Sequence, residues 1–458
     1  MSLILKRSLS LTLSVLSTAA VAQDKVVYGV DNRLEVYEAP QSLQVVASST
    51  AAMIPNAALK ASVVDGETVY QTHQGILQDG GICEDDRFAK QPNPGMCSGF
   101  LVGPDLLVTA GHCVNRSSSC ESNAWVFDFK VEAGSDRAGT KVLAKDVYKC
   151  KQIINVVLNN FSKADYALIQ LERVASDRAP LKFRSEEKVS DGQGIVVIGH
   201  PMGLPTKVAD GANVRDNDHP EYFTANLDTF GGNSGSAVFN MNDLTVEGIL
   251  VRGETDYVYN DDKGCQEVYK CDDDKCRGED VSRITSILEL AMRDKVLAAA
   301  ESGDKALIET YLAKKGWVDI YDNARESLLI KATKAQSSDI AKLLLKVRAD
   351  VALTDLSGKV ALHHLAEAAT TGEAGAEILK ALSEKTGFNV DARDNAGETA
   401  LIKAVKNNNT KLVELLLNLG ADALVTDKAG KTALSYTRPF NLSHFKMRRL
   451  LKRSLAKN

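Results

Sequence analysis

The sequence predicts a multidomain chain, with an all-β domain over residues 23–290 followed by an all-α solenoid over residues 291–458. Three observations lead to this division. All eight cysteines lie before residue 277. In the same part, short apolar stretches such as 195–198 and 246–251 are bounded by glycine and proline, as strands are. From about residue 291 cysteine disappears, helical periodicity begins, and one motif recurs at a nearly fixed period.

Residues 1–22 form the first predicted element. They contain Lys6 and Arg7, then an apolar run that starts at Leu9, then small residues that end at Ala22, a layout typical of a secretory signal peptide. An uncleaved membrane anchor is the alternative, but the run is short for a span and is interrupted by Ser and Thr. No other segment has the length and apolarity of a span. We therefore expect a secreted or periplasmic protein that begins at Gln23 and has no membrane partner after cleavage.

Three motifs in the β region predict catalysis by a serine nucleophile. His112, in Thr-Ala-Gly-His-Cys, is followed 53 residues later by Asp165 and a further 69 residues later by Ser234, in Gly-Gly-Asn-Ser-Gly-Ser. A serine hydroxyl is a weak nucleophile at neutral pH and needs an imidazole to take its proton. The imidazole in turn needs a buried carboxylate on its other nitrogen. We expect these roles for Ser234, His112 and Asp165 respectively.

The glycines before Ser234 predict the remaining part of such a site. Glycine lets the backbone turn so that two N–H groups point at one developing oxyanion, and these would be the amides of Gly232 and Ser234. Taken alone, Gly-Asn-Ser-Gly is most often only a turn. The catalytic interpretation depends on all three motifs occurring together, with His112 after the strand-like stretches 98–102 and 106–109.

These motifs resemble those of the trypsin-like (chymotrypsin-fold) serine peptidases, and the resemblance covers approximately residues 26–285. It implies a chymotrypsin-like double barrel and a serine-type endopeptidase that needs no cofactor and no metal. The Gly-Asn-Ser-Gly-Ser form and residues 26–33 are most similar to the bacterial branch that includes the glutamyl endopeptidases. Two departures stand out. Asn233 replaces the Asp that pairs with a new N-terminus in the digestive enzymes, and residues 248–253 lack the His that binds a substrate glutamate.

The resemblance also implies an S1 pocket formed by Asp228, Thr229 and Arg252. Asp228 lies six residues before Ser234, where trypsin-like enzymes place the carboxylate that binds a P1 Arg or Lys. A buried carboxylate needs a cation, from the substrate or from the protein. We therefore expect a basic P1 residue, unless Arg252 pairs with Asp228 and closes the pocket to it.

An even number of cysteines confined to one part of an exported chain predicts disulfides. The resemblance implies a bridge between Cys97 and Cys113 that closes the histidine loop, and Cys120–Cys150 is a further plausible pair. A zinc site at Cys265, Cys271 and Cys276 is the alternative, although a fourth Cys or a His is not nearby. The formal charge of −5 indicates no nucleic-acid partner, and the basic residues 446–453 are expected to be a solvated end of a capping helix.

The second half of the chain repeats a leucine-centred helix start. The central leucines, at 329, 362, 401 and 434, are 33, 39 and 33 residues apart. This period, with a Thr-x-Leu-His-like start, resembles ankyrin repeats. Residues 297–319 would form an N-terminal cap, giving about five repeats. We expect His363 and His364 to make internal turn hydrogen bonds and not to bind metal.

We expect this array to bind a protein partner or substrate on its concave face, because repeat arrays present such surfaces and carry no catalytic site of their own. The combined interpretation is an exported serine endopeptidase with a recruiting array. Two alternatives remain: a protein-binding scaffold without catalysis, and a protease whose array regulates the barrel. Since a triad needs no solenoid, a chain that ends near residue 290 is expected to hydrolyse a small peptide.

Overall fold

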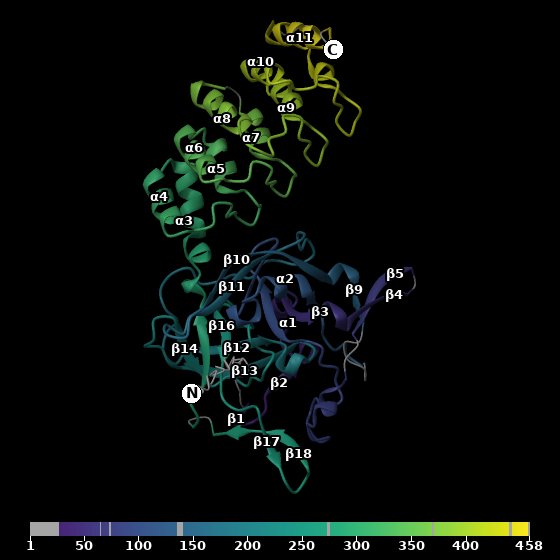
Figure 1. Ribbon diagram of the computed structural model, residues 1–458, viewed down its shortest axis with the longest axis vertical. Helices are drawn as coiled ribbons and strands as arrows, with labels where there is room; N and C mark the ends of the chain where they lie inside the picture. The colour runs from purple at the N-terminus through teal and green to yellow at the C-terminus, as the bar shows by residue number, and fades with distance from the viewer. Residues whose placement is uncertain are drawn as a thin grey trace, which may run out of the picture.

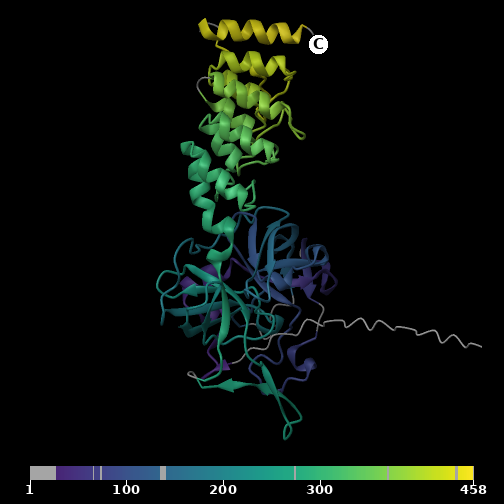
Figure 2. The same ribbon diagram turned by 60° about the vertical axis from the view of Figure 1, so that its left-hand side comes forward.

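The computed structural model describes residues 27–64, 66–72, 75–134, 141–272, 275–368, 371–438 and 442–456. The predicted signal peptide at residues 1–22 lies outside the described residues. Strands gather in a compact body, and a column of paired helices rises from one side of it (Figures 1 and 2). The C-terminus lies at the far end of that column.

The first barrel is a closed ring of six antiparallel strands in the order β10-β11-β7-β6-β3-β8. Apolar side chains of alternate residues fill its interior, and Trp125, Phe100 and Phe127 are among the largest fully buried side chains. The strands are β3 (Thr50–Pro55), β6 (Cys97–Leu101), β7 (Leu106–Thr109), β8 (Asn123–Phe127), β10 (Val147–Leu158) and β11 (Asp165–Leu171).

The second barrel is a six-stranded antiparallel ring in the order β12-β15-β16-β20-β14-β13, closed by the pairing of β12 with β13. A seventh strand, β2 (Arg33–Glu35), adds to β13. The ring strands are β12 (Gly194–Gly199), β13 (Lys207–Asp216), β14 (Tyr222–Ala225), β15 (Ala237–Asn240), β16 (Val246–Arg252) and β20 (Glu279–Arg283). The predicted chymotrypsin-like double barrel is confirmed.

Smaller elements surround the two barrels. β1 (Val27–Tyr28) pairs in parallel with β19 (Lys270–Cys271), β17 (Tyr257–Asn260) and β18 (Cys265–Val268) form a hairpin, and β4 (Leu59–Val64), β5 (Glu67–Thr72) and β9 (Lys141–Leu143) form a separate sheet. Two short helices are α1 (Gln41–Ala47) and α2 (Ser117–Ser122). Single 3-10 turns are η1 (Val36–Glu38), η2 (Asn56–Ala58), η3 (Leu77–Gly80), η4 (Gly111–Cys113), η5 (Ala144–Asp146), η6 (Pro201–Gly203) and η7 (Ile284–Ser286).

Every cysteine forms a disulfide, and all four bridges lie in the β region. Cys97–Cys113 closes the histidine loop and Cys120–Cys150 is also present, both as predicted. Cys265 pairs with Cys83, 182 residues away, and Cys271 pairs with Cys276. The zinc alternative for Cys265, Cys271 and Cys276 is therefore wrong, because none of the three offers a free thiolate.

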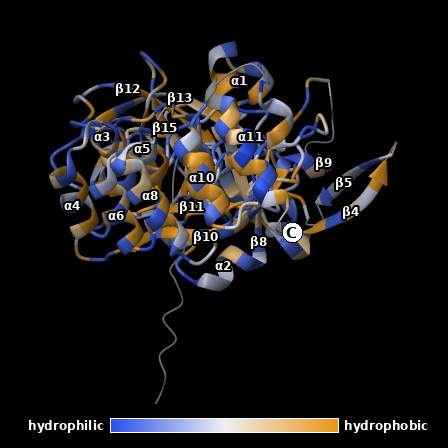
Figure 3. Cartoon of the chain, turned by 90° about the horizontal axis from the view of Figure 1, so that it is seen from above, coloured by the Kyte–Doolittle hydropathy of each residue, from blue (hydrophilic) through white to orange (hydrophobic). Residues whose placement is uncertain are grey.

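The array consists of helix pairs that stack along one direction (Figure 1). Figure 3, a view along the column, shows both apolar and polar residues on the helices, and the buried apolar residues of successive pairs form one continuous core. The elements are α3 (Leu288–Ser302), α4 (Lys305–Ala313), α5 (Leu328–Lys334), α6 (Ser338–Lys346), α7 (Ala361–Glu367), α8 (Glu373–Ser383), α9 (Ala400–Lys406), α10 (Thr410–Asn418), η8 (Ala433–Tyr436) and α11 (Leu442–Leu455).

An aspartate begins the turn before the first helix of four successive repeats and bonds a side chain nine residues further on. Its Oδ1 accepts backbone N–H groups two and four residues later, and so shapes the turn. The partner is a lysine in two repeats, a histidine in one and a tyrosine in the last. The pairs are Asp322–Lys331 at 2.9 Å, Asp355–His364 at 3.0 Å, Asp394–Lys403 at 2.8 Å, and Asp427–Tyr436.

The two histidines of α7, His363 and His364, lie inside the array. His363 Nδ1 accepts the N–H of Val360 at 3.2 Å, and its Nε2 donates to the carbonyl of Glu398 in the next repeat at 3.0 Å. The predicted turn hydrogen bond is thus present for His363. His364 instead donates to Asp355, and burial lowers the pKa of both imidazoles.

The array docks onto the first barrel through a buried polar contact. Tyr321 Oη donates to Asp105 Oδ1 at 2.6 Å, while Gln170 and Arg325 contact the other oxygen at 3.1 Å and 3.3 Å. Leu353, from the next repeat, also packs into the apolar core of the barrels. The predicted boundary at residue 290 falls inside α3, and Leu290 belongs to that same core. The first helices are therefore part of the barrel's packing.

Candidate active site

The histidine and the aspartate of the predicted triad are in contact. His112 lies on η4, directly after β7, and Asp165 is the first residue of β11. His112 Nδ1 is 2.8 Å from Asp165 Oδ2, and the backbone N–H of His112 donates to Asp165 Oδ1 at 3.1 Å. Two bonds from one carboxylate fix both the ring and its backbone. Nδ1 carries the proton in this arrangement, so Nε2 is left as the basic nitrogen.

The serine comes from the other barrel. Ser234 lies in the loop between β14 and β15, so the triad would be assembled across the junction of the two barrels. Ser234 is 9% exposed, whereas the side chain of His112 is 33% exposed. Among the described residues, no hydrogen bond joins the Ser234 hydroxyl to His112. Such bonds are often long before a substrate binds and tighten in the complex.

The loop that carries Ser234 depends on glycine at two positions. Gly232 has φ +84°, and a Cβ there would lie 2.7 Å from the backbone N of Gly203. Gly235 has φ +93°, and a Cβ there would collide with the carbonyl oxygen of Ser98. Only glycine fits both the left-handed backbone and the close approach. Within the described chain, the N–H groups of Gly232 and Ser234 donate to no protein acceptor, as the two donors of an oxyanion hole require.

Ser98, at the start of β6, connects the first barrel to this loop. Its N–H donates to the carbonyl of Ser234 at 2.8 Å, its hydroxyl donates to the carbonyl of Gly232 at 3.0 Å, and the N–H of His200 donates to the same hydroxyl at 3.0 Å. Ser98 is fully buried. The sequence identified residues 98–102 only as a strand, because a serine beside a cysteine carries no signal for this role.

His200 has a structural role. It is fully buried, its Nδ1 lies 3.0 Å from the carbonyl of Leu204, and its ring stacks on Phe129. Burial lowers the pKa of His200 to about 3, so the imidazole stays neutral.

Asp228 has partners different from those expected. Its Oδ1 accepts the N–H of Tyr28 at 2.7 Å and its Oδ2 accepts the N–H of Asn32 at 3.2 Å, so the segment before β2 lies against it. Burial raises the pKa of Asp228 to about 7. Arg33 covers Phe230 at 4.0 Å and holds this segment in place. The segment before β2 thus contacts the predicted S1 pocket at Asp228. Asn233 Oδ1, by contrast, accepts a hydrogen bond from the Ser236 hydroxyl.

Arg252 does not pair with Asp228, so the alternative in which that ion pair closes the pocket is wrong. Its guanidinium instead bonds Asp280 at 3.0 Å and comes within 3.9 Å of Asp165. Thr229 donates its hydroxyl to Glu279 Oε2 at 2.7 Å. Glu279 is a second buried carboxylate beside the stretch that leads to Ser234, and nothing in its sequence context singled it out.

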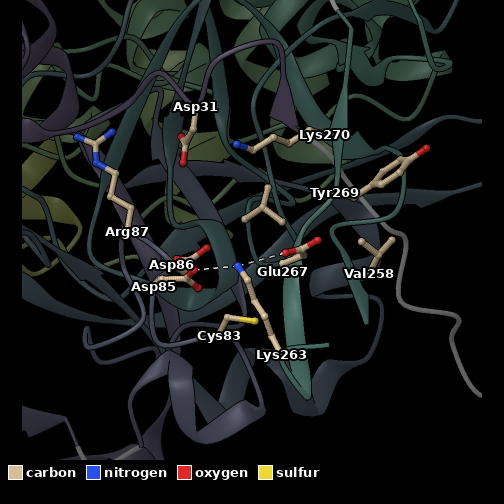
Figure 4. Close-up of a pocket in the computed structure, with 11 residues that line it drawn as sticks. Asp31, Cys83, Asp85, Asp86, Arg87, Val258, Lys263, Glu267, Tyr269 and Lys270 are labelled. Atoms are coloured by element: carbon tan, nitrogen blue, oxygen red, sulfur yellow. Dashed lines mark hydrogen bonds and ion pairs between the residues drawn. The ribbon is translucent and has the colours of Figure 1, made fainter. Parts of the chain in front are cut away.

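One cavity of the described residues lies away from these groups. It has a volume of about 640 Å³ and lies between residues 83–87, Asp31 and the β17–β18 hairpin (Figure 4). In Figure 4, Lys263 reaches between Asp85 at 2.8 Å and Glu267 at 3.5 Å. No triad residue lines this cavity.

Two clusters in the described chain bring three potential metal ligands together. The first, Cys97, His112 and Cys113, is consumed by the disulfide. The second joins His364 and Asp355 to Glu326, whose two oxygens already accept bonds from Lys331 and Lys334. Both carboxylate oxygens of Glu326 in the second cluster are thus already paired with lysine ammonium groups.

Comparisons with known proteins agree with this architecture. Residues 97–249 match the family model of the trypsin-like peptidase domain, and residues 382–436 match that of ankyrin repeats. The fold and the site therefore define a trypsin-like peptidase domain followed by a repeat array. The bacterial glutamyl branch stays a prediction.

Relatives match over about a quarter of the chain. A putative ankyrin repeat protein of Rickettsia bellii (strain RML369-C) is 30% identical over 128 residues, 28% of this chain and 68% of that protein. The neurogenic locus notch homolog protein 1 of Homo sapiens and that of Danio rerio are each 32% identical over 120 residues, 26% of this chain. The chain spans only 4% and 5% of their respective lengths. The chain belongs to the ankyrin repeat proteins.

Proposed function

We propose that this chain is an exported serine endopeptidase whose ankyrin array binds a protein partner or the substrate itself. The observation that carries the proposal is the doubly bonded His112–Asp165 pair opposite the glycine-shaped loop of Ser234. A structural loop needs neither an imidazole held in one tautomer nor a pair of N–H groups without acceptors. A peptidase needs both.

In this mechanism Ser234 Oγ attacks the carbonyl carbon of the scissile peptide, and its proton passes to His112 Nε2. The oxyanion accepts hydrogen bonds from the N–H groups of Gly232 and Ser234. The C–N bond then breaks as His112 returns the proton to the leaving amine, which leaves an ester on Ser234. Water, deprotonated by His112, hydrolyses that ester. Asp165 holds the ring throughout and stabilises its cationic form.

The direct test is covalent labelling of the purified mature protein with a serine-directed phosphonate. We expect one phosphonyl group on the peptide that contains Ser234, and no label on Ser234→Ala. Labelling elsewhere, or an equal rate for the variant, would remove Ser234 from the mechanism.

For the P1 position we propose a basic residue. Two buried carboxylates, Asp228 and Glu279, flank Thr229, and Arg252 is engaged with Asp280 and does not compete for Asp228. Profiling a peptide library with the wild type, Asp228→Asn and Glu279→Gln identifies which carboxylate binds the P1 cation. A preference for glutamate or for large apolar residues in the wild type would exclude the proposal.

Export is supported by the four disulfides, which persist in oxidising compartments. In the described part of the chain, none of the helices combines the length and the apolarity needed to cross a membrane. N-terminal sequencing of the protein recovered from the medium or the periplasm tests the predicted start at Gln23. Recovery from the cytosol with reduced cysteines would contradict export.

A further inference from the structure

Arg252 connects the two barrels at the triad. It ends β16 of the second barrel, and its Nε donates to Asp280 Oδ2 at 3.0 Å on the neighbouring strand β20. Its Nη2 donates to the carbonyl of Lys163, in the first barrel, at 3.0 Å. Its Nη1 is 3.9 Å from Asp165 Oδ2, the oxygen that bonds the His112 ring. The Arg252 side chain thus contacts both the loop that precedes β11 and Asp165, the residue with which β11 begins.

The surroundings of Arg252 hold the guanidinium in this position. The side chain is only 12% exposed and lies over the ring of Tyr222 at 5.5 Å. Asp280 receives a second cation, Arg277, on its other oxygen at 2.6 Å. The charged groups that face Arg252 are therefore Asp280 on β20 and Asp165 on β11, with Arg277 behind Asp280. A planar guanidinium with donors in fixed directions suits such a bridge, and a lysine ammonium does not.

This bridge matters because the triad is divided between the barrels. His112 and Asp165 belong to the first barrel and Ser234 to the second, so their alignment depends on contacts that cross the junction. Misplacement of a reacting group by about 1 Å can cost about 100-fold in rate. The Asp165 loop has an anchor on the second barrel through Arg252.

Resting on the proposed peptidase function, we propose that Arg252 is a positioning residue. It holds the Lys163–Asp165 segment from the opposite barrel and thereby sets the position of the His112 ring relative to Ser234. Its positive charge also offsets part of the Asp165 charge that the His112 imidazolium experiences. In this proposal Arg252 acts through Asp165, which its Nη1 approaches at 3.9 Å.

The test compares Arg252→Gln and Arg252→Lys with Arg277→Gln, a control that removes the other cation on Asp280 and leaves Asp165 untouched. Active-site titration with the phosphonate first sets the concentration of competent enzyme. For Arg252→Gln we expect kcat to fall between about 10- and 100-fold while KM changes little, because alignment is lost and binding is not. Arg277→Gln is expected to stay within about twofold of the wild type.

The pH profile separates positioning from a merely structural role. Loss of a cation beside Asp165 favours the His112 imidazolium, so the acid limb of kcat/KM should move to higher pH by about 0.5–1 unit in Arg252→Gln. Arg252→Lys keeps the charge, so its acid limb should stay in place while kcat recovers only in part. The proposal would be overturned if Arg252→Gln and Arg252→Lys lost kcat equally and the acid limb of kcat/KM stayed at the pH of the wild type in both.

A readout without catalysis completes the design. The proton between His112 Nδ1 and Asp165 gives a low-field NMR resonance, and its titration should shift in Arg252→Gln and stay unchanged in Arg277→Gln. If the wild type is neither labelled nor active, the peptidase function fails, and this resonance still decides the role of Arg252. If Arg252→Gln does not fold, Asp280→Asn loosens the anchor and keeps the cation, and an unaltered resonance in that variant contradicts the proposal.

Discussion

Tyr321 of the array donates its hydroxyl to Asp105 of the barrel at 2.6 Å, and both side chains are buried. Asp105 lies in the turn between β6 and β7, and β7 leads directly to His112. The array is therefore attached to the part of the barrel that positions His112, the proposed general base. The alternative in which the array regulates the barrel therefore has a physical basis, because this contact links the two.

Replacing Tyr321 by Phe tests this coupling. The ring still fills its site, but Asp105 loses one of its donors, so we expect the free energy of unfolding to fall by about 1–3 kcal/mol. Chemical denaturation followed by both activity and helical circular dichroism measures the effect. Tyr436→Phe is the matched control, because it also removes a Tyr–Asp bond, at the far end of the array. An equal change in activity-monitored stability for the two variants would argue against coupling at Asp105.

We expect a stable truncated chain to need the repeats that pack on the barrels, and not to end at the predicted boundary at residue 290. A chain that ends near residue 290 loses Tyr321 and Leu353, which pack with the barrels. We therefore expect it to be much less stable than the full chain. In contrast to the expectation from the sequence, it should not hydrolyse a small peptide. A chain that ends at Ser383 keeps α3–α8 and these contacts.

We expect the form ending at Ser383 to cleave a small chromogenic peptide at the full-length rate. It should lose efficiency on a protein substrate that the array recruits, because tethering raises the local concentration. Kinetics on both substrates measure the difference. Equal losses on both would assign the distal repeats a structural role, and faster cleavage of the small peptide would indicate autoinhibition.

Ser234→Ala or His112→Ala should lower peptidase turnover by about five to six orders of magnitude, because the members of a triad act as a unit. Neither change removes a buried apolar group, so the melting temperature should change little. Hydrolysis of a peptide ester and of the matching amide, each normalised to folded protein, provides the measurement. Turnover within tenfold of the wild type in either variant would contradict the assigned roles.

Asp228 predicts a pH dependence of stability. Its pKa is raised to about 7 in the folded state by burial, whereas an Asp in the unfolded chain titrates near 4. Between these values the folded chain holds a proton that the unfolded chain has released. Its contribution to the free energy of unfolding is therefore largest below about pH 4, falls by roughly 4 kcal/mol at most as the pH rises to about 7, and is constant above that.

Urea unfolding at several pH values, compared between the wild type and Asp228→Asn, isolates this contribution. Asp228→Asn should lack the part of the decline in the free energy of unfolding that the titration of Asp228 causes. Asp319→Asn is the comparison variant, since burial raises the pKa of Asp319, in the array, only to about 6. A decline of the same size in Asp228→Asn and the wild type would show that Asp228 does not hold a proton in the folded state.

The parts of this molecule that could be predicted from the sequence are those whose chemistry restricts residue type and spacing. The double barrel, the repeats and the Cys97–Cys113 bridge belong to this group. Contacts between distant segments could not be predicted. Residues 28 and 32 reach Asp228 across nearly 200 positions, and Tyr321 reaches Asp105 across 216, through backbone amides and a tyrosine that have no distinctive local pattern.

Arg252 shows why the sequence left the pairing of charges at the pocket open. The sequence offered only Asp228 as its partner, and the structure adds Asp280; the choice depends on which carboxylate already has donors. Asp228 is satisfied by two backbone N–H groups, so the guanidinium turns to Asp280, which lies opposite it in the β16–β20 register. Burial and register decide such pairings, and neither is readable from one strand.

The nine-residue pairing in the array has an evolutionary consequence. Each aspartate finds its partner within its own repeat, so duplicating or deleting a distal unit would break no such pair in the units that remain. In the described part of the chain, Tyr321, Arg325 and Leu353 of the first repeats make contacts with the barrel. Recombination could therefore change the reach of the array while its attachment to the barrel, and the chemistry beneath it, stayed the same.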